Sequence, residues 1–387
     1  MIGPAALAPL PNHEEPLIRR VMPELDSMRG VAILWVFLYH ALFVVGDIAA
    51  PGPILKSLFV LSRSGWLGVD LFFVLSGFLI TGILLDSAQR PAGAYFKNFY
   101  ARRALRILPL YYLGLIFFSV VLWGRGKVSL GFVSLSLVYL SNLAIVLGYA
   151  AAPALQVLWS LSVEEHFYLA WPMLVRAFRR WHLVALLVAV ALLEPAVRAL
   201  GVAVWGVSQT HLSVATWFRL DGLVMGAALA LAVRAPSMTR RRFSRIGTGS
   251  ILVAALIFGA GLPFGILSRK VPLGAALQYS CASLLFAGLL ALVVCAGSGR
   301  FSRWVQIRPL MAAGRISYCM YLVHVFIIQS FDRAVLTMGS HPGTFLHLPL
   351  LSVAVRLLLL LLVTILTSEL SFRFYERPFL ERKRFFT

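Results

Sequence analysis

The sequence predicts an all-α protein, a polytopic transmembrane helical bundle of about ten membrane-spanning helices with one further re-entrant or interfacial helix. Composition gives the first reason: 60% of the 387 residues are hydrophobic, 13% are charged and the mean hydropathy is +0.86, outside the range of soluble domains. The second reason is that apolar runs of about 20 residues, the length that crosses a bilayer, recur along the chain. One membrane domain is therefore expected to account for most of the protein.

Ten apolar runs follow one another from the N-terminus, each long enough to span the hydrocarbon layer. They are residues 30–48, 66–86, 105–123, 156–176, 182–200, 211–233, 247–264, 274–297, 311–331 and 349–371. On this basis we divide the chain into a cytoplasmic N-terminal segment (1–24), a membrane domain (25–376) and a basic cytoplasmic tail (377–387).

The distribution of basic residues sets the expected topology, because cytoplasmic connections are enriched in Lys and Arg. If the ten runs cross and an additional run, 130–148, does not, most of the 35 basic residues fall on one side of the membrane. Run 130–148 also carries Ser134, Ser136, Ser141 and Asn142, which suits a helix that re-enters the bilayer or lies at its surface. Both termini are therefore predicted to be cytoplasmic, in a multi-pass protein of the cytoplasmic (inner) membrane.

Charge and cysteine content argue against two other classes of partner. The net charge of +20 does not indicate a nucleic-acid partner, because the basic residues separate apolar runs instead of forming one patch. Cys281, Cys295 and Cys319 lie in apolar stretches without CxxC spacing. Neither a disulfide framework nor a metal site is predicted.

Polar residues inside the predicted spans are the strongest indication of function, because such groups are costly to place in lipid. Arg29 begins the first span and His40 lies eleven positions further along, which is ~16 Å along a helix and about half the hydrocarbon thickness. Glu164, Asp221 and His324 are also expected near mid-depth. We therefore predict that charged and polar groups from four helices share one interior cavity.

A buried histidine close to a carboxylate suits general-base catalysis, because the carboxylate fixes the imidazole tautomer and stabilises the imidazolium. Glu164 and Glu165 differ by 100° around a helix, so one is expected to act in the cavity while the other pairs locally. The same groups would also serve a proton-coupled transporter, or neutralise one another between helices.

Arg103 and Arg106 lie three residues apart at the basic end of the third span, and so share a helix face. Their guanidinium groups have the geometry that clamps phosphate oxygens. Anchoring to anionic lipid headgroups is the alternative.

Taken together, these segments resemble the acyltransferase 3 family of integral membrane O-acyltransferases, which modify envelope polysaccharides, lipid-linked sugars and some macrolide sugars. Six segments carry the resemblance in family order: Leu25 to His40, Gly68 to Thr81, Tyr100 to Tyr112, Trp159 to Tyr168, Ser317 to His324, and Tyr375 to Phe379. Ser27 departs from the glycine that is common after Leu-Asp.

The resemblance implies transfer of a short acyl group, above all acetyl, from a cytoplasmic acyl-coenzyme A to a hydroxyl of a saccharide or macrolide acceptor. It implies catalytic roles for His40, Arg29 and Glu164, and donor binding by Arg103 and Arg106. Substrate contacts are expected from Asp26, Tyr168, Tyr318 and His324. The esterase-like domain fused to some relatives is absent from this sequence, so an extracytoplasmic partner protein is a further expectation. The rival interpretation is a transporter or flippase for lipid-linked saccharides, although no inverted repeat supports it.

Overall fold

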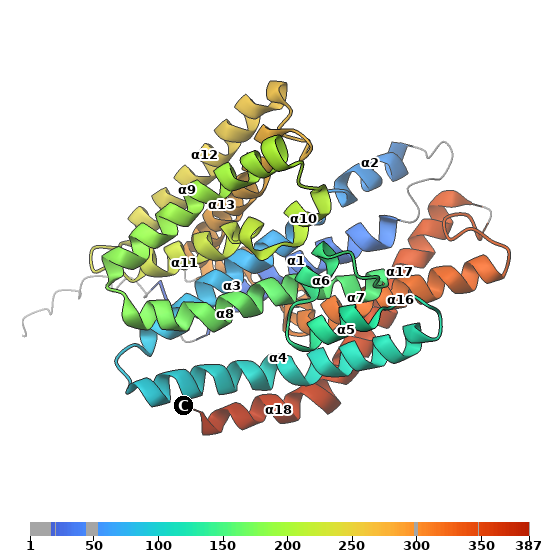
Figure 1. Cartoon of the computed structure of the whole chain (residues 1–387), viewed down its shortest axis with the longest axis horizontal. Coiled ribbons are helices and arrows are strands. Elements are labelled where there is room, and N and C mark those ends of the chain that lie inside the picture. Colours follow the sequence, from blue (N-terminus) through green and yellow to red (C-terminus); the bar gives the residue numbers. More distant parts are fainter. Residues whose placement is uncertain (1–16, 20, 44–52, 298–300, 347, 387) are drawn as a thin grey trace, which may run out of the picture.

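The computed structural model describes residues 17–19, 21–43, 53–297, 301–346 and 348–386. Within these ranges the chain folds into helices and their connections, with no β-strand (Figure 1). The predicted all-α class is confirmed. An isolated antiparallel bridge joins Val128 to Ala151 and closes the segment between them.

Some helices match the predicted runs to within two residues at each end, others begin six or more residues away, and the run 211–233 is divided. The long helices are α1 (Pro23–Phe43), α3 (Leu67–Asp86), α4 (Ala92–Trp123), α8 (Leu158–Ala177), α9 (Arg180–Trp205), α11 (Asp221–Val233), α12 (Arg240–Gly261), α13 (Pro272–Gly297), α16 (Ser317–Thr337) and α17 (Pro349–Ser371). Shorter helices are α2 (Pro53–Ser62), α5 (Leu130–Leu137), α6 (Ser141–Val146), α7 (Pro153–Gln156), α10 (Gln209–Val214), α14 (Ser302–Val305), α15 (Arg308–Arg315) and α18 (Arg377–Glu381).

Eight helical segments in the described part of the chain are long and apolar enough to cross a membrane. Two predicted spans are not among them. Helix α8 carries Glu164, Glu165 and Arg176, and the run 211–233 is broken into α10, a 3₁₀ turn at Thr216–Phe218 and the 13-residue α11. The count of about ten crossings therefore stays a prediction.

The run 130–148 forms no spanning helix. It contains α5 and α6, of eight and six residues, separated by Tyr139 with a φ of 58°. Neither helix is long enough to cross the hydrocarbon layer, as the serine and asparagine content of the run predicts. The two helices lie against α4 and α8 (Figure 1).

Helices α3 and α11 pack backbone to backbone at the centre of the molecule. A Cβ atom at Gly77 would lie 2.0 Å from the carbonyl oxygen of Leu223, and one at Gly226 would lie 2.0 Å from that of Val74. Small residues permit this approach between membrane helices, where dispersion contacts replace the hydrophobic effect. The contact fixes the positions of α3 and α11, which both carry charged groups of the interior.

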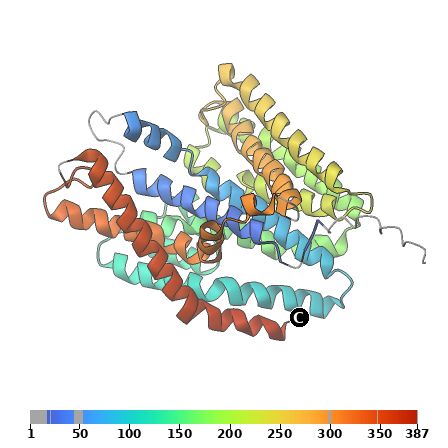
Figure 2. The same ribbon diagram turned by 180° about the vertical axis from the view of Figure 1, so that it is seen from behind.

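Helix α17 continues without a break into the C-terminal segment. Phe372–Glu376 forms a π-helical turn, α18 follows, and a 3₁₀ turn covers Arg382–Phe385. Figure 2 shows this segment beside α4, where the Tyr375 hydroxyl donates to the carbonyl of Pro109 at 3.1 Å. The basic end of the chain therefore packs on the helix that carries Arg103 and Arg106.

Candidate functional site

The interior holds a first cavity of about 110 Å³, here called the basic cavity. Helices α1, α3, α4, α8 and α16 enclose it. Its polar lining consists of Arg29, Ser76, Arg103, Arg106, Ser160, Glu164, Glu165, Tyr168, Ser317, Tyr318 and Tyr321. Six residues selected in the sequence analysis therefore line one cavity: Arg29, Arg103, Arg106, Glu164, Tyr168 and Tyr318.

Three guanidinium groups converge on the basic cavity, from Arg29, Arg103 and Arg106. The Arg103 guanidinium lies 5.7 Å from the centre of the Tyr168 ring and 6.0 Å from that of Phe99, a cation–π arrangement that orients it. Like charges gathered in a partly dehydrated space repel one another unless an anion joins them. The cavity is accordingly suited to phosphate groups.

Two carboxyl groups balance part of this charge. Glu164 Oε1 accepts a hydrogen bond from Ser76 Oγ at 2.5 Å, and the Tyr168 hydroxyl donates to the same Ser76 oxygen at 3.1 Å. Glu165 Oε1 is buried and has no hydrogen-bond partner in the described part of the chain. The expectation that only one of the two acids faces the cavity is wrong. The cavity extends around α8 from α3 to α16, so it meets both faces of that helix.

A second cavity of about 270 Å³ lies beside the first and is here called the aromatic cavity. It contains no acidic lining residue among those described. Its side chains with rings or charges are Tyr39, His40, Trp66, Trp159, Arg219, Arg269, Tyr279 and Tyr321. Val69 and Tyr321 line both cavities and so form the wall between them.

Hydrogen bonds define the protonation of His40. Its Nδ1 lies 3.0 Å from the carbonyl oxygen of Val36 and 3.1 Å from His324 Nε2. A carbonyl oxygen only accepts, so in the neutral ring the proton is on Nδ1 and the lone pair is on Nε2. His324 Nδ1 donates to the carbonyl oxygens of Met320 and Tyr321 at 3.0 and 2.9 Å, which leaves its Nε2 to accept from His40. This is the tautomer of His40 that a base acting through Nε2 requires.

The prediction that His40, Glu164, Asp221 and His324 share one cavity is wrong. His40 lines the aromatic cavity, whereas Glu164 lines the basic one. His324 is fully buried behind His40, and Asp221 belongs to a separate ion network. A common depth along four helices does not determine which face each helix turns to the interior. Among the described residues, the groups that orient His40 are consequently a second histidine and a backbone carbonyl, and no carboxylate contacts it.

Two other predicted substrate contacts, Asp26 and Tyr318, do not line the aromatic cavity. Asp26 forms an ion pair with Arg29 at 3.0 Å and lines neither cavity. Tyr318 lies in the basic cavity, where its hydroxyl donates to the carbonyl of Ile107 at 2.8 Å. Its position is therefore on the arginine side of the dividing wall instead of the histidine side.

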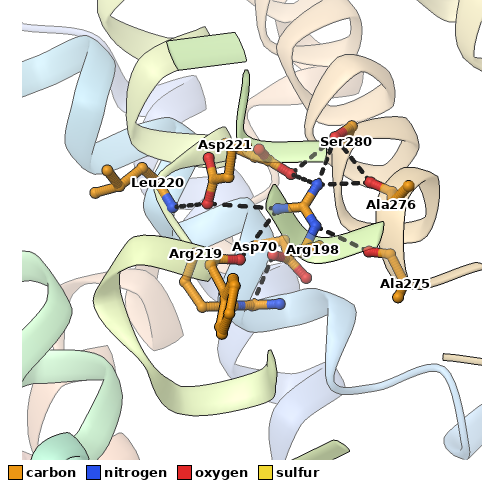
Figure 3. Close-up of polar contacts among 10 residues, drawn as sticks. Asp70, Arg198, Arg219, Leu220, Asp221, Ala275, Ala276 and Ser280 are labelled. Carbon is orange, nitrogen blue, oxygen red and sulfur yellow. Dashed lines mark hydrogen bonds and ion pairs between the residues drawn. The ribbon is translucent and has the colours of Figure 1, made fainter. Parts of the chain in front are cut away.

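A buried ion network on α3, α9, α11 and α13 was not anticipated as a unit (Figure 3). Arg198 contacts Asp221 at 2.9 Å and Glu194 at 3.4 Å. Arg219 Nη2 pairs with Asp70 at 2.8 Å. The sequence signal was the i,i+4 spacing of Glu194 and Arg198 within an apolar run, which is typical of an intrahelical ion pair. The network joins these four helices beside the aromatic cavity.

A second buried ion pair ties the other side of the bundle. Both guanidinium nitrogens Nε and Nη2 of Arg356 contact the carboxylate of Asp332 at 2.7 Å, and Nη1 donates to the carbonyl of Ala41. Helices α16 and α17 are thereby fixed to α1 one residue beyond His40. The sequence signal for this pair is an arginine, Arg356, inside the apolar run 349–371.

Eight described helical segments long and apolar enough to cross a membrane, packed around two cavities, are typical of a multi-pass integral membrane protein. Residues 22–369 match the acyltransferase domain that characterises the acyltransferase 3 family, and the chain belongs to this family.

Curated relatives have the same domain within longer chains. The chain is 28% identical to the peptidoglycan O-acetyltransferase OatA of Listeria monocytogenes, over 93% of this chain and 56% of that protein. It is 31% identical to the putative peptidoglycan O-acetyltransferase YrhL of Bacillus subtilis, over 93% of this chain and 55% of the relative. The chain is 26% identical to the O-acetyltransferase OatA of Staphylococcus aureus, over 93% of this chain and 57% of that protein. The chain thus spans a little over half the length of these relatives. No solved structure matches it.

Proposed function

We propose that the protein is an O-acetyltransferase that moves an acetyl group from acetyl-coenzyme A to a saccharide hydroxyl. The observation that carries this proposal is the pair of adjoining cavities of different chemistry, which have only Val69 and Tyr321 in common among their lining residues. One cavity offers arginines for a phosphorylated donor, and the other offers His40 and aromatic rings for an acceptor. Two of the relatives are named peptidoglycan O-acetyltransferases, one of them as putative, and this supports a saccharide acceptor.

The donor binds through its phosphates in the basic cavity. Arg103 and Arg106 supply forked donors on one face of α4, and Arg29 adds a third charge from α1. The pantetheine arm then extends toward the wall at Val69 and Tyr321. Glu164, held by Ser76, limits the excess of positive charge beside the arm.

The acceptor hydroxyl approaches the wall from the aromatic cavity. His40 Nε2 takes the hydroxyl proton as the oxygen attacks the thioester carbonyl. The tetrahedral intermediate then collapses with cleavage of the C–S bond, and the imidazolium returns the proton to the leaving thiolate. The products are the O-acetyl ester and coenzyme A. His324 is a positioning residue, because it contacts His40 and lines neither cavity.

The donor mouth faces the cytoplasm in this proposal, with both termini on the same side and the acceptor reaching the aromatic cavity from outside. This orientation follows the bias of basic residues toward one set of connections. It also places the protein in the cytoplasmic membrane, where the donor is available, and leaves room for an extracytoplasmic partner that carries the group onward.

The test uses the full chain purified in nanodiscs with labelled acetyl-coenzyme A and a soluble glycan acceptor. The parent is expected to release free coenzyme A and to form an alkali-labile acetyl ester. His40→Gln should lower the rate by about 10²-fold or more, because glutamine cannot take up the proton. His182→Gln is the matched control, since His182 is an exposed residue on α9. Equal rates for His40→Gln and the parent would refute the role of His40. Movement of lipid-linked glycan without coenzyme A release would indicate a flippase instead.

A further inference from the structure

The guanidinium of Arg269 in the aromatic cavity is hydrogen-bonded to neutral groups. Arg269 Nη1 donates to Ser213 Oγ at 2.9 Å and to the Tyr279 hydroxyl at 2.5 Å. Its guanidinium also lies 5.2 Å from the centre of the Trp66 ring. Across the described ranges, no carboxylate comes within ion-pair distance of it. Neutral hydroxyls and an aromatic face therefore hold the group in place and leave its charge available.

A second arginine in the same cavity has hydrogen-bond donors to spare. Arg219 is 3% exposed, and its Nη2 pairs with Asp70. Its Nε and Nη1 have no partner among the described residues, although its guanidinium lies 3.8 Å from the centre of the Tyr279 ring. Buried N–H groups without acceptors are rare in folded proteins, and a ligand is one of the few ways to satisfy them.

The neighbouring charges explain why these two arginines differ from Arg198. Arg198 has two carboxylates and three backbone carbonyls around it, so its role is structural. Among the described residues, Arg219 has one carboxylate within ion-pair distance and Arg269 has none. Arg198, in the ion network of Figure 3, is therefore fully paired, whereas Arg219 and Arg269, which line the aromatic cavity, can still bind an anion.

We propose that the aromatic cavity recognises its acceptor through an oxyanion on the saccharide, a carboxylate or a phosphate, which Arg219 and Arg269 bind together. The inference rests on the proposed function and specifies its substrate class. Trp66, which is partly exposed and lines the cavity, offers an aromatic surface on which the C–H face of a sugar ring packs. The hydroxyl to be acetylated then lies toward His40, on the same cavity wall.

The experiment measures binding, so that it is independent of turnover. Three forms of one N-acetylglucosamine tetrasaccharide are compared by isothermal titration: the neutral alditol, the aldonate with one carboxylate, and the glycosyl phosphate. The full chain is held in a polyoxyethylene detergent, which contains neither sugar nor phosphate. The variants are Arg269→Gln, the charge-conserving Arg269→Lys, and Lys270→Gln. Lys270 is the exposed neighbour of Arg269 and lies outside the cavity lining.

The parent is expected to bind both anionic forms about 10-fold or more tightly than the alditol at low salt, with the difference shrinking as salt rises. Arg269→Gln should remove this preference while the Kd of the alditol stays within about twofold. Arg269→Lys should retain part of it, and Lys270→Gln should retain all of it. The tighter of the two anions identifies whether a sugar acid or a sugar phosphate is the natural group.

Equal Kd values for the three forms in the parent would overturn the inference. So would an Arg269→Gln variant that loses affinity for the alditol as much as for the anions, because the arginine would then be structural. Coenzyme A release measured on the same preparation tests the proposed function separately. A protein that prefers the anions but releases no coenzyme A contradicts the enzyme and still supports the anionic site.

Discussion

Replacing His324 tests how the interior supports His40. His324→Phe keeps an aromatic ring of similar size in a fully buried position but removes the Nε2 acceptor that lies 3.1 Å from His40 Nδ1. In the resting enzyme this costs one neutral hydrogen bond, and the carbonyl of Val36 remains at 3.0 Å. When His40 becomes an imidazolium, the same contact becomes charge-assisted, so the loss is larger in the transition state than in the ground state.

The difference between a charge-assisted and a neutral hydrogen bond is about 1 to 1.5 kcal/mol, which corresponds to about a 10-fold lower kcat. The KM values for donor and acceptor should stay close to those of the parent, because His324 lines neither cavity. His324→Gln, which presents an amide oxygen as acceptor, should recover part of the rate.

The assay is steady-state coenzyme A release at several concentrations of each substrate, on preparations matched by size-exclusion profile and thermal midpoint. A His324→Phe enzyme with the parental kcat would show that this hydrogen bond does not support the imidazolium. A change confined to KM would show that His324 acts on substrate binding instead.

The remaining predictions concern the donor site, the packing of the core and the topology. Arg103→Ala combined with Arg106→Ala should raise the KM for acetyl-coenzyme A with little change in kcat, whereas the exposed Arg102→Ala should change neither. Gly77→Ala should lower the thermal midpoint, since its Cβ would meet a carbonyl oxygen of α11 at 2.0 Å, a cost of about 1 to 3 kcal/mol; Gly93→Ala, with open space around it, should not. A reporter fused to the C-terminus should be active only in its cytoplasmic form, and activity of a periplasm-dependent reporter there would reverse the proposed orientation.

The spans were predictable where apolar length alone defines a helix. The run 349–371 coincides with α17, and 66–86 and 274–297 differ from α3 and α13 by one or two residues at one end. Helix α4 begins at Ala92, well before the predicted start at residue 105. Hydropathy detects only the part of a helix that lies in lipid, and the polar first turns of α4 lie along the C-terminal segment and the mouth of the basic cavity.

The residues of the site were easier to predict than their grouping. Arg29, Arg103 and Arg106 could be selected as charges at the basic end of predicted spans, and Glu164 as a costly charge near mid-depth. The structure brings all four into one cavity. The separation of His40 from Glu164 depends on how α1 and α8 are rotated about their axes. That rotation is set by contacts distant in sequence, such as Ser76 with Glu164 and His324 with His40, and no local pattern encodes it.

The wall formed by Val69 and Tyr321 bears on how the membrane keeps its electrical potential. Both side chains are almost fully buried, at 8% and 7% exposure, and the Tyr321 hydroxyl is fixed by Ser160 at 2.6 Å. A continuous watery passage between two polar chambers would conduct protons and dissipate the membrane potential, which is worth about 2.3 kcal/mol per charge at 100 mV. In the proposed reaction, only the uncharged acetyl group passes the wall. It does so as its thioester bond to coenzyme A is replaced by an ester bond to the acceptor. Under that proposal, the acetyl group crosses the wall while the membrane stays electrically closed.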